Sequence, residues 1–231
     1  VRDQVFAVLF GAGLQYDAFL TAFRIPNLLR DLFAEGALSA SFVTTFTQTL
    51  QSQGKDAAIR LWNRVATLII VLITAISVVA WIYAPENVAL LAPGFAAVPG
   101  KTALTIELTR IMIPFLLLIA LAAQAMGMLN AFNIFGVPAL ASAFFNIGSI
   151  IGGLLLGYSL APFLGLTPIA GMAYGTLVGG FLQFAVQWPS LRRCGVSYAP
   201  AISLSDPGVR QIFRLMGPAI IGTAAVQINV F

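Results

Sequence analysis

The chain has 231 residues, of which 59% are hydrophobic and only 9% are charged, and its formal net charge is +4. Soluble proteins average about 25% charged residues. A water-soluble fold cannot hide this much apolar surface, so we expect an integral membrane protein. The chain has no His and one Cys. This composition excludes His-based acid–base catalysis, an internal disulfide framework and Cys- or His-rich metal sites.

Apolar segments in chain order predict six membrane spans and the start of a seventh. The second segment is too long for one straight crossing of about 20 residues, and Pro26 and Gly36 can break it. Both chain ends lie in apolar runs, so we expect a fragment. The fold class predicted is all-α, a polytopic transmembrane helical bundle. The expected spans cover residues 1–11, 17–50, 62–84, 103–129, 138–157 and 168–189, with the seventh starting near 213.

Two of the predicted spans contain residues that are unusual within a simple apolar helix. Pro114 interrupts the fourth span, which also carries Gln124. The fifth span is rich in small residues, which permit close packing of helices in lipid. These small residues include Gly148, Gly152, Gly153 and Gly157.

Basic residues gather in the segments that follow the second and sixth spans. The opposite side holds only Lys101, with Arg110 at the entry of span four. The positive-inside rule therefore places the loops after spans 2, 4 and 6 in the cytoplasm. We expect residues 1–200 to form an N-terminal transmembrane lobe and residues 201–231 to hold a cytoplasmic connector and the start of a second lobe. The gathered residues are Lys55, Arg60, Arg64, Arg192, Arg193, Arg210 and Arg214.

The segment 17–41 is unusually polar for this chain. At 100° per residue, Asp17, Thr21 and Arg24 share one helix face. Charges at membrane depth need a partner, a water-filled cavity or a ligand. One interpretation is a helix that lines a cavity, and the other is an amphipathic helix in the headgroup plane. The mixture of arginines with acids favours the cavity, because interfacial helices favour Lys and Arg. Beyond Pro26, one side carries Asn27, Arg30, Asp31, Ala34 and Glu35.

Motifs for enzymatic chemistry are missing from the sequence. It has no GxxxxGK[ST] loop, no metal-ligand spacing and no nucleophile beside a His base. Asp31 and Glu35 could form a pair of acids on one face, but they are more simply interpreted as partners of Arg24 and Arg30. We therefore expect no catalytic residue, no metal site and no cofactor. The basic residues are not interleaved with aromatic residues in a soluble module, so nucleic-acid binding is not indicated.

Several motifs resemble those of the MurJ (MviN) family of bacterial lipid II flippases. The resemblance covers the whole chain and implies a MATE-like fold of the multidrug/oligosaccharidyl-lipid/polysaccharide exporter superfamily. This chain would be the N-terminal six-helix lobe of a two-lobe transporter plus the start of helix seven. The motifs are RD at 2–3, FGAG at 10–13, DAF at 17–19, AFRIPNLLR at 22–30, LFAEGALS at 32–39, APGF at 92–95, LNAFNIFGVPA at 129–139 and MGPAI at 216–220.

The resemblance also implies a substrate-binding cavity. Arg2, Arg24 and Arg30 would hold a pyrophosphate, because guanidinium forks match phosphate oxygens. The acids would position these arginines. From the residues alone, Arg2 and Asp3 could equally lie at a solvated helix end. Asp31 departs from the family, where a basic residue is common. The candidate cavity residues are Arg2, Asp3, Asp17, Arg24, Asn27, Arg30, Asp31 and Glu35.

The implied function is transport of an undecaprenyl-pyrophosphate-linked muropeptide, lipid II, to the outer leaflet of the bacterial cytoplasmic membrane. Two lobes would rock around the cavity in alternating access, and coupling to Na⁺, H⁺ or the membrane potential stays open. Expected partners are lipid II, membrane lipids and cell-wall synthesis proteins. One alternative is a cation-coupled drug or polysaccharide-lipid exporter of the same superfamily. Another is a membrane scaffold for cell-wall synthesis that transports nothing.

Overall fold

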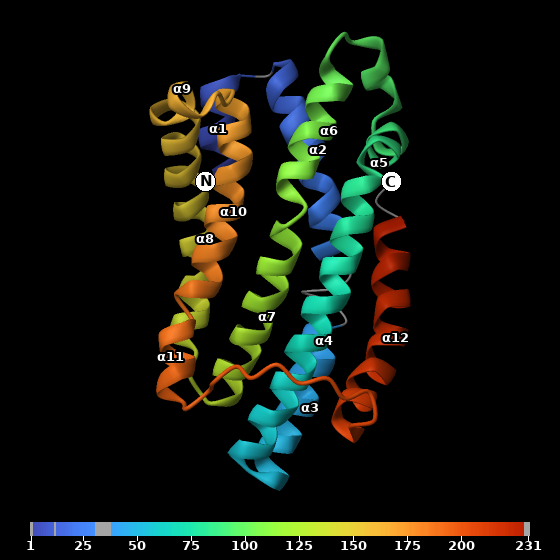
Figure 1. The fold of residues 1–231 in the computed structure, drawn as a ribbon, viewed down its shortest axis with the longest axis vertical. Helices are drawn as coiled ribbons and strands as arrows, with labels where there is room; N and C mark the ends of the chain where they lie inside the picture. The colour runs from blue at the N-terminus through green and yellow to red at the C-terminus, as the bar shows by residue number, and fades with distance from the viewer. Residues whose placement is uncertain (1, 12, 31–37, 229–231) are drawn as a thin grey trace.

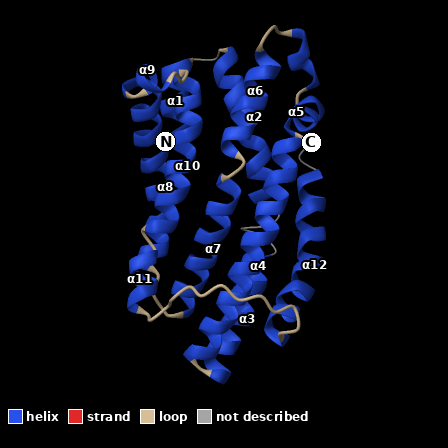
Figure 2. Cartoon of the chain, in the orientation of Figure 1, coloured by secondary structure: helices blue, strands red, loops and turns tan. Residues whose placement is uncertain are grey.

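A computed structural model describes residues 2–11, 13–30 and 38–228. Helices joined by turns and loops make up this part of the chain, and no strand occurs among the residues described (Figure 2). Most of the long helices run along the long axis of the molecule (Figure 1). The all-α prediction is therefore confirmed.

The N-terminal helices lie in different parts of the bundle: α1 packs against α8, α2 against α6, and α3 against α4, α7 and α12. Pro26 is buried within α2 and does not end this helix, which continues to Arg30. The predicted break at Gly36 lies outside the described residues. These helices are α1 (Arg2–Phe10), α2 (Leu14–Arg30) and α3 (Leu38–Gln53).

Pro114 interrupts the helix that begins at Lys101, as predicted. Proline has no backbone N–H and cannot close the helical hydrogen bond to residue 110. The chain tightens here into bonds of the i→i+3 type, from the Leu116 N–H to the Ile113 carbonyl (3.0 Å) and from the Leu117 N–H to the Pro114 carbonyl (3.2 Å). The elements of this region are α4 (Lys55–Ile82), α5 (Ala84–Leu91), the 3₁₀ helix η2 (Pro93–Ala97), α6 (Lys101–Met112) and α7 (Phe115–Ala131).

Small residues bring α8 (Gly136–Leu154) and α10 (Pro168–Ala185) into close contact. A Cβ added at Gly148 would lie 2.7 Å from Leu182 Cδ1, and one added at Gly157 would lie 2.6 Å from the Pro168 carbonyl oxygen. The packing role expected for these glycines is therefore present. The remaining elements are the π-helical turn η3 (Leu155–Ser159), α9 (Ala161–Leu164), α11 (Trp188–Arg193) and α12 (Pro207–Ile228).

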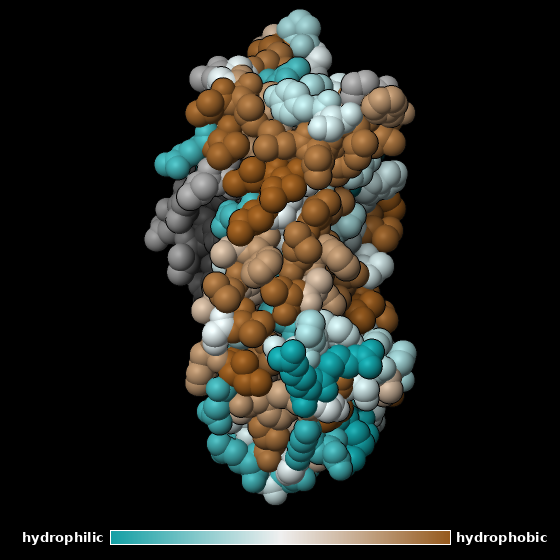
Figure 3. Space-filling model, turned by 90° about the vertical axis from the view of Figure 1, so that its left-hand side faces the viewer, coloured by the Kyte–Doolittle hydropathy of each residue, from teal (hydrophilic) through white to brown (hydrophobic). Residues whose placement is uncertain are grey.

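Among the described residues, four helical segments are long and apolar enough to cross a membrane. An apolar band covers much of one face of the molecule, and hydrophilic residues gather at one end of it (Figure 3). The chain is therefore a multi-pass membrane protein. The segments are Lys55–Ile82, Lys101–Ala131, Gly136–Ser159 and Pro168–Arg193.

Four of the basic residues that follow the second and sixth predicted spans lie at one end of the bundle. Lys55 begins α4, Arg192 and Arg193 end α11, and Arg210 lies in the first turn of α12. Figure 1 shows these helix ends together at the lower end of the molecule. Lys101 begins α6 at the opposite end. The charge asymmetry seen in the sequence is thus an asymmetry of the folded molecule.

A connector, residues 194–206, crosses the lower end of the bundle from α11 to α12 (Figure 1). Polar side chains of α4 hold it: Asn63 Oδ1 accepts the Ala199 N–H (3.2 Å) and Thr67 Oγ1 accepts the Ala201 N–H (3.1 Å). Asp206, the last residue of the connector, forms an ion pair with Arg64 of α4. The start of α12 is therefore tied to α4.

Thr67→Val is expected to loosen this connector. The change keeps the side-chain shape but removes two contacts with the connector, the acceptor for the Ala201 N–H and the 3.0 Å contact with the Tyr198 hydroxyl, and one hydrogen bond contributes about 1 kcal/mol. We expect amide hydrogen exchange over residues 196–206 to speed up several-fold, as measured by mass spectrometry. Thr44→Val is the matched control, because within the described part of the chain the Thr44 hydroxyl donates to the Ala40 carbonyl (2.9 Å) of its own helix and has no bond to the connector. Unchanged exchange at the connector would contradict the role given to Thr67.

Candidate functional site

One face of α2 packs into the bundle, and the other carries exposed charged residues. Ala18, Phe19 and Ala22 are fully buried against a cluster that includes Phe6 of α1. Asp17 and Arg24 are exposed on the opposite side. With a rise of 1.5 Å per residue, these two charges lie about 10 Å apart along the helix. The polar face predicted for this helix is therefore not covered by the described part of the chain.

Asp17 pairs with a lysine from a distant element. Lys101 Nζ donates to Asp17 Oδ2 at 3.1 Å, and the Lys101 side chain is only 11% exposed against 53% for Asp17. The same ammonium lies 3.9 Å from the centroid of the Phe95 ring. A carboxylate and an aromatic face thus stabilise one buried cation.

Local structure explains how Lys101 reaches this position. Gly100 has φ +77°, a left-handed conformation that suits glycine, and α6 begins directly after it. Phe95 belongs to the APGF motif, which folds into η2 just before this turn. Lys101 was not among the candidate cavity residues. The sequence does single Lys101 out in one respect: it is the one basic residue in the loops predicted to lie on the side opposite the basic segments.

Asn27 and Arg30 lie closer to the C-terminal end of α2 than Asp17 and Arg24, and both are half-buried. Asn27 Oδ1 is buried and accepts no hydrogen bond from the described residues. Arg24 and Arg30 each take part in an interaction within the chain. Arg30 lies one helical turn from Asn27, whose amide oxygen has no hydrogen-bond partner among the described residues. A guanidinium and an amide at this spacing form a polar environment that can hold an anion together with a hydroxyl or amide donor.

Of the other predicted cavity residues, the structure describes the backbone of Arg2 and Asp3. Arg2 and Asp3 lie in the first turn of α1, which packs against α2 and α8. The contacts of their side chains lie outside what the structure describes. Asp31 and Glu35 lie outside the described residues.

In residues 2–11, 13–30 and 38–228, no group of three or more His, Cys, Asp or Glu side chains could hold a metal ion.

Comparison with solved structures identifies the class of protein. An outward-facing MATE transporter of the MOP superfamily matches all of this chain and 49% of its own length with a TM-score of 0.71 at 18% identity, which shows a shared fold. The structure titled "Lipid II flippase MurJ, inward closed conformation" matches 99% of this chain and 45% of its own length, with a TM-score of 0.72 and 26% identity. The fold is that of one half of a MATE-like transporter.

Sequence comparison identifies the family. The protein-family model described as "Lipid II flippase MurJ" matches residues 6–231, so the chain belongs to the MurJ family. A probable lipid II flippase MurJ of Vibrio cholerae is 36% identical over 236 residues, covering 99% of this chain and 44% of the relative. A lipid II flippase MurJ of Burkholderia cenocepacia is 34% identical over 232 residues, again covering 99% of this chain and 44% of the relative. The chain spans less than half the length of these relatives.

Proposed function

We propose that the complete protein containing this chain moves lipid II from the inner to the outer leaflet of the bacterial cytoplasmic membrane. The observation that carries this proposal is the family match over residues 6–231. The open charged face of α2, with Asp17 and Arg24 exposed, supports it, because a charged headgroup needs polar groups along its route through the bilayer. The protein would act as a transporter and not as an enzyme.

The proposed mechanism is alternating access around a cationic cavity. Arg2, Arg24 and Arg30 would bind the pyrophosphate through charge-assisted hydrogen bonds. Asp3, Asp31 and Glu35 would partner the arginines when the cavity is empty. Asp17 would act at the outer end through Lys101, to which it is paired. The lipid tail would stay in the bilayer while the headgroup crosses.

The charge asymmetry supports a proposed orientation. The end that carries Lys55, Arg192 and Arg193 would lie in the cytoplasm by the positive-inside rule. The loops after spans 2, 4 and 6 would then be cytoplasmic, and Lys101 would lie near the outer surface. An inside-negative membrane potential could drive the reset of a cationic empty carrier, at about 2.3 kcal/mol per charge per 100 mV. Coupling to Na⁺ or H⁺ is the alternative.

The test uses the complete protein in cells depleted of their own flippase. Arg2→Ala and Arg30→Ala are expected to abolish growth while the protein still accumulates in the membrane, because each removes a phosphate ligand. Arg193→Ala, at the end of α11, is the control and is expected to support growth. If both cavity variants sustain growth and lipid II movement, the pyrophosphate role of these arginines is wrong.

The MATE fold supports a second candidate, a cation-coupled exporter of drugs or of polysaccharide lipids. Such a protein would confer drug resistance, and its loss would leave the cell wall intact. A third possibility, a scaffold that recruits cell-wall synthesis proteins, would need no arginine at membrane depth. Lipid II accumulation after depletion of the complete protein separates the flippase from both alternatives.

A further inference from the structure

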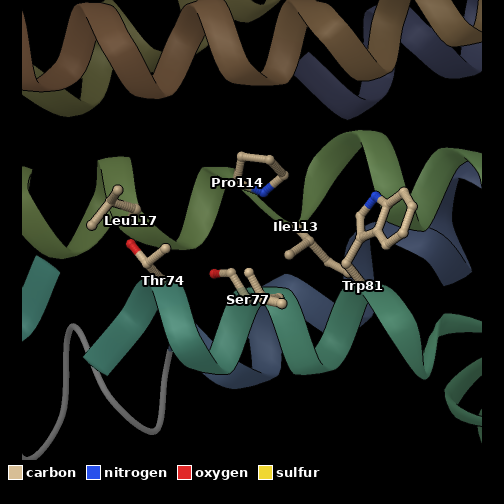
Figure 4. Close-up of a pocket in the computed structure, with 7 residues that line it drawn as sticks. Thr74, Ser77, Trp81, Ile113, Pro114 and Leu117 are labelled. Atoms are coloured by element: carbon tan, nitrogen blue, oxygen red, sulfur yellow. The ribbon is translucent and has the colours of Figure 1, made fainter. Parts of the chain in front are cut away.

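A groove runs along α4 and the break that separates α6 from α7, and its wider part also reaches Tyr174 and Leu177 of α10. Its narrower part has a volume of ≈ 340 Å³ and its wider part ≈ 720 Å³, and both parts are lined by Trp81 and Pro114. Figure 4 shows the narrower part between α4 and the interrupted helix. Among the residues that the structure describes, none from α1 or α2 lines either part. The groove therefore lies apart from the candidate residues of α2, which are Asp17, Arg24, Asn27 and Arg30.

The narrower part is an apolar slot. Val78, Ile113 and Leu117 line it, and the hydroxyls of Thr74 and Ser77 point toward it (Figure 4). Ser77 Oγ is buried and has no hydrogen-bond partner among the described residues. Pro114, where the helix opposite α4 is interrupted, also lines the slot. A slot of this kind accepts a hydrocarbon chain.

The wider part carries one base and one acid. Arg110 Nε donates to the Trp81 carbonyl oxygen at 3.3 Å, and its guanidinium lies 4.7 Å from the centroid of the Trp81 ring. A guanidinium has five N–H donors, and within the described residues only this one is engaged. Glu107 is exposed, one turn before Arg110, and makes no ion pair or hydrogen bond with the part of the chain described. Both charges are thus available to a ligand.

The base and the acid lie at the level of a membrane surface. Trp81 and Tyr83 are exposed at the end of α4, and such aromatic residues lie at the boundary between hydrocarbon and headgroups. Arg110 is held on Trp81 at this boundary. Thr74 lies about 10 Å along α4 from Trp81, on the hydrocarbon side. The groove therefore runs from the headgroup level into the apolar layer.

We propose that this groove binds a glycerophospholipid whose headgroup carries a phosphate and a primary ammonium. The phosphate binds Arg110, the ammonium binds Glu107, and one acyl chain enters the slot beside Leu117. Side chains at i and i+3 lie about 5–6 Å apart on a helix, which fits the short separation of the two charges in a phosphatidylethanolamine headgroup. A purely anionic headgroup would place negative charge beside Glu107. A choline headgroup has no N–H to donate to this carboxylate.

The acyl-chain half of the proposal is tested by fluorescence quenching. The complete protein is reconstituted in vesicles that contain phosphatidylethanolamine with brominated acyl chains, and the difference between this protein and its Trp81→Phe variant isolates the Trp81 signal. Quenching of Trp81 is expected to be several-fold stronger with brominated phosphatidylethanolamine than with brominated phosphatidylcholine at equal content. Equal quenching by the two lipids would overturn the proposal.

The headgroup half is tested by native mass spectrometry of the complete protein in detergent, with added phosphatidylethanolamine or phosphatidylglycerol. Arg110→Gln is expected to weaken phosphatidylethanolamine binding about tenfold, since a charge-assisted bond is lost. Glu107→Gln is expected to remove the preference for phosphatidylethanolamine over phosphatidylglycerol. Arg193→Gln, at the opposite end of the molecule, is the control and should leave binding unchanged. Unfolding temperatures of the lipid-free variants show whether each still folds, and unchanged lipid preference in folded variants overturns the proposal.

Discussion

Gly175→Ala is expected to destabilise the protein by about 3 kcal/mol, the upper end of the usual cost of overpacking. Gly175 lies on the face of α10 that meets α8, and a Cβ added there would overlap the backbone nitrogen of Gly153 and lie 2.7 Å from the Ser149 carbonyl oxygen. Backbone atoms cannot turn aside as a side chain can. The two helices must therefore separate, and the contacts along their interface weaken together. Thermal unfolding of the purified complete protein measures the loss.

Substitutions at two further glycines test whether the loss of stability follows how closely each glycine is packed. Gly136→Ala is the control, because a Cβ at Gly136 meets nothing within 4 Å. It should leave stability unchanged or raise it by up to about 1 kcal/mol, since Ala favours helix more than Gly. Gly148→Ala should fall between the two, because its nearest atom belongs to the flexible Leu182 side chain. If Gly175→Ala unfolds at the same temperature as Gly136→Ala, the close contact of α8 with α10 does not contribute to stability.

Elements that depend on local chemistry could be predicted from the sequence. The uncharged run before Trp81 predicted a long apolar helix, and α4 covers it. Pro114 predicted an interrupted helix because the missing N–H acts within one turn. Pro26, in contrast, sits inside α2 without ending it. A proline alone does not decide between a bend and a break, since the surrounding packing determines which one forms.

Contacts between distant residues could not be predicted from helical phase. The phase of α2 placed Asp17 and Arg24 on one face, and both are exposed there. It could not identify Lys101, 84 residues away, as the partner of Asp17. That pair depends on how α6 packs against α2 and on the turn that ends at Gly100. The roles of the cavity arginines stay predictions, because they concern a ligand.

Asp17→Asn is expected to destabilise the protein more than Lys101→Met, although the two changes break the same ion pair. Asn leaves the Lys101 ammonium, only 11% exposed, without its carboxylate, and an unpaired buried charge costs about 2 kcal/mol after allowance for the half-exposed partner. Met replaces the Lys101 side chain with an unbranched apolar chain one atom shorter and leaves Asp17, 53% exposed, to water. Chemical unfolding of the complete protein should therefore rank the variants in this order.

The double variant with Asp17→Asn and Lys101→Met gives the decisive comparison, because the buried charge is then absent. It should recover most of the stability lost in Asp17→Asn, which a double-mutant cycle reports as a coupling between the two sites. If Asp17 acts in transport only by holding Lys101, the double variant should also support growth in flippase-depleted cells better than Asp17→Asn does. Recovered stability without recovered growth would instead place the Asp17 carboxylate itself on the substrate route, on the same exposed face of α2 as Arg24.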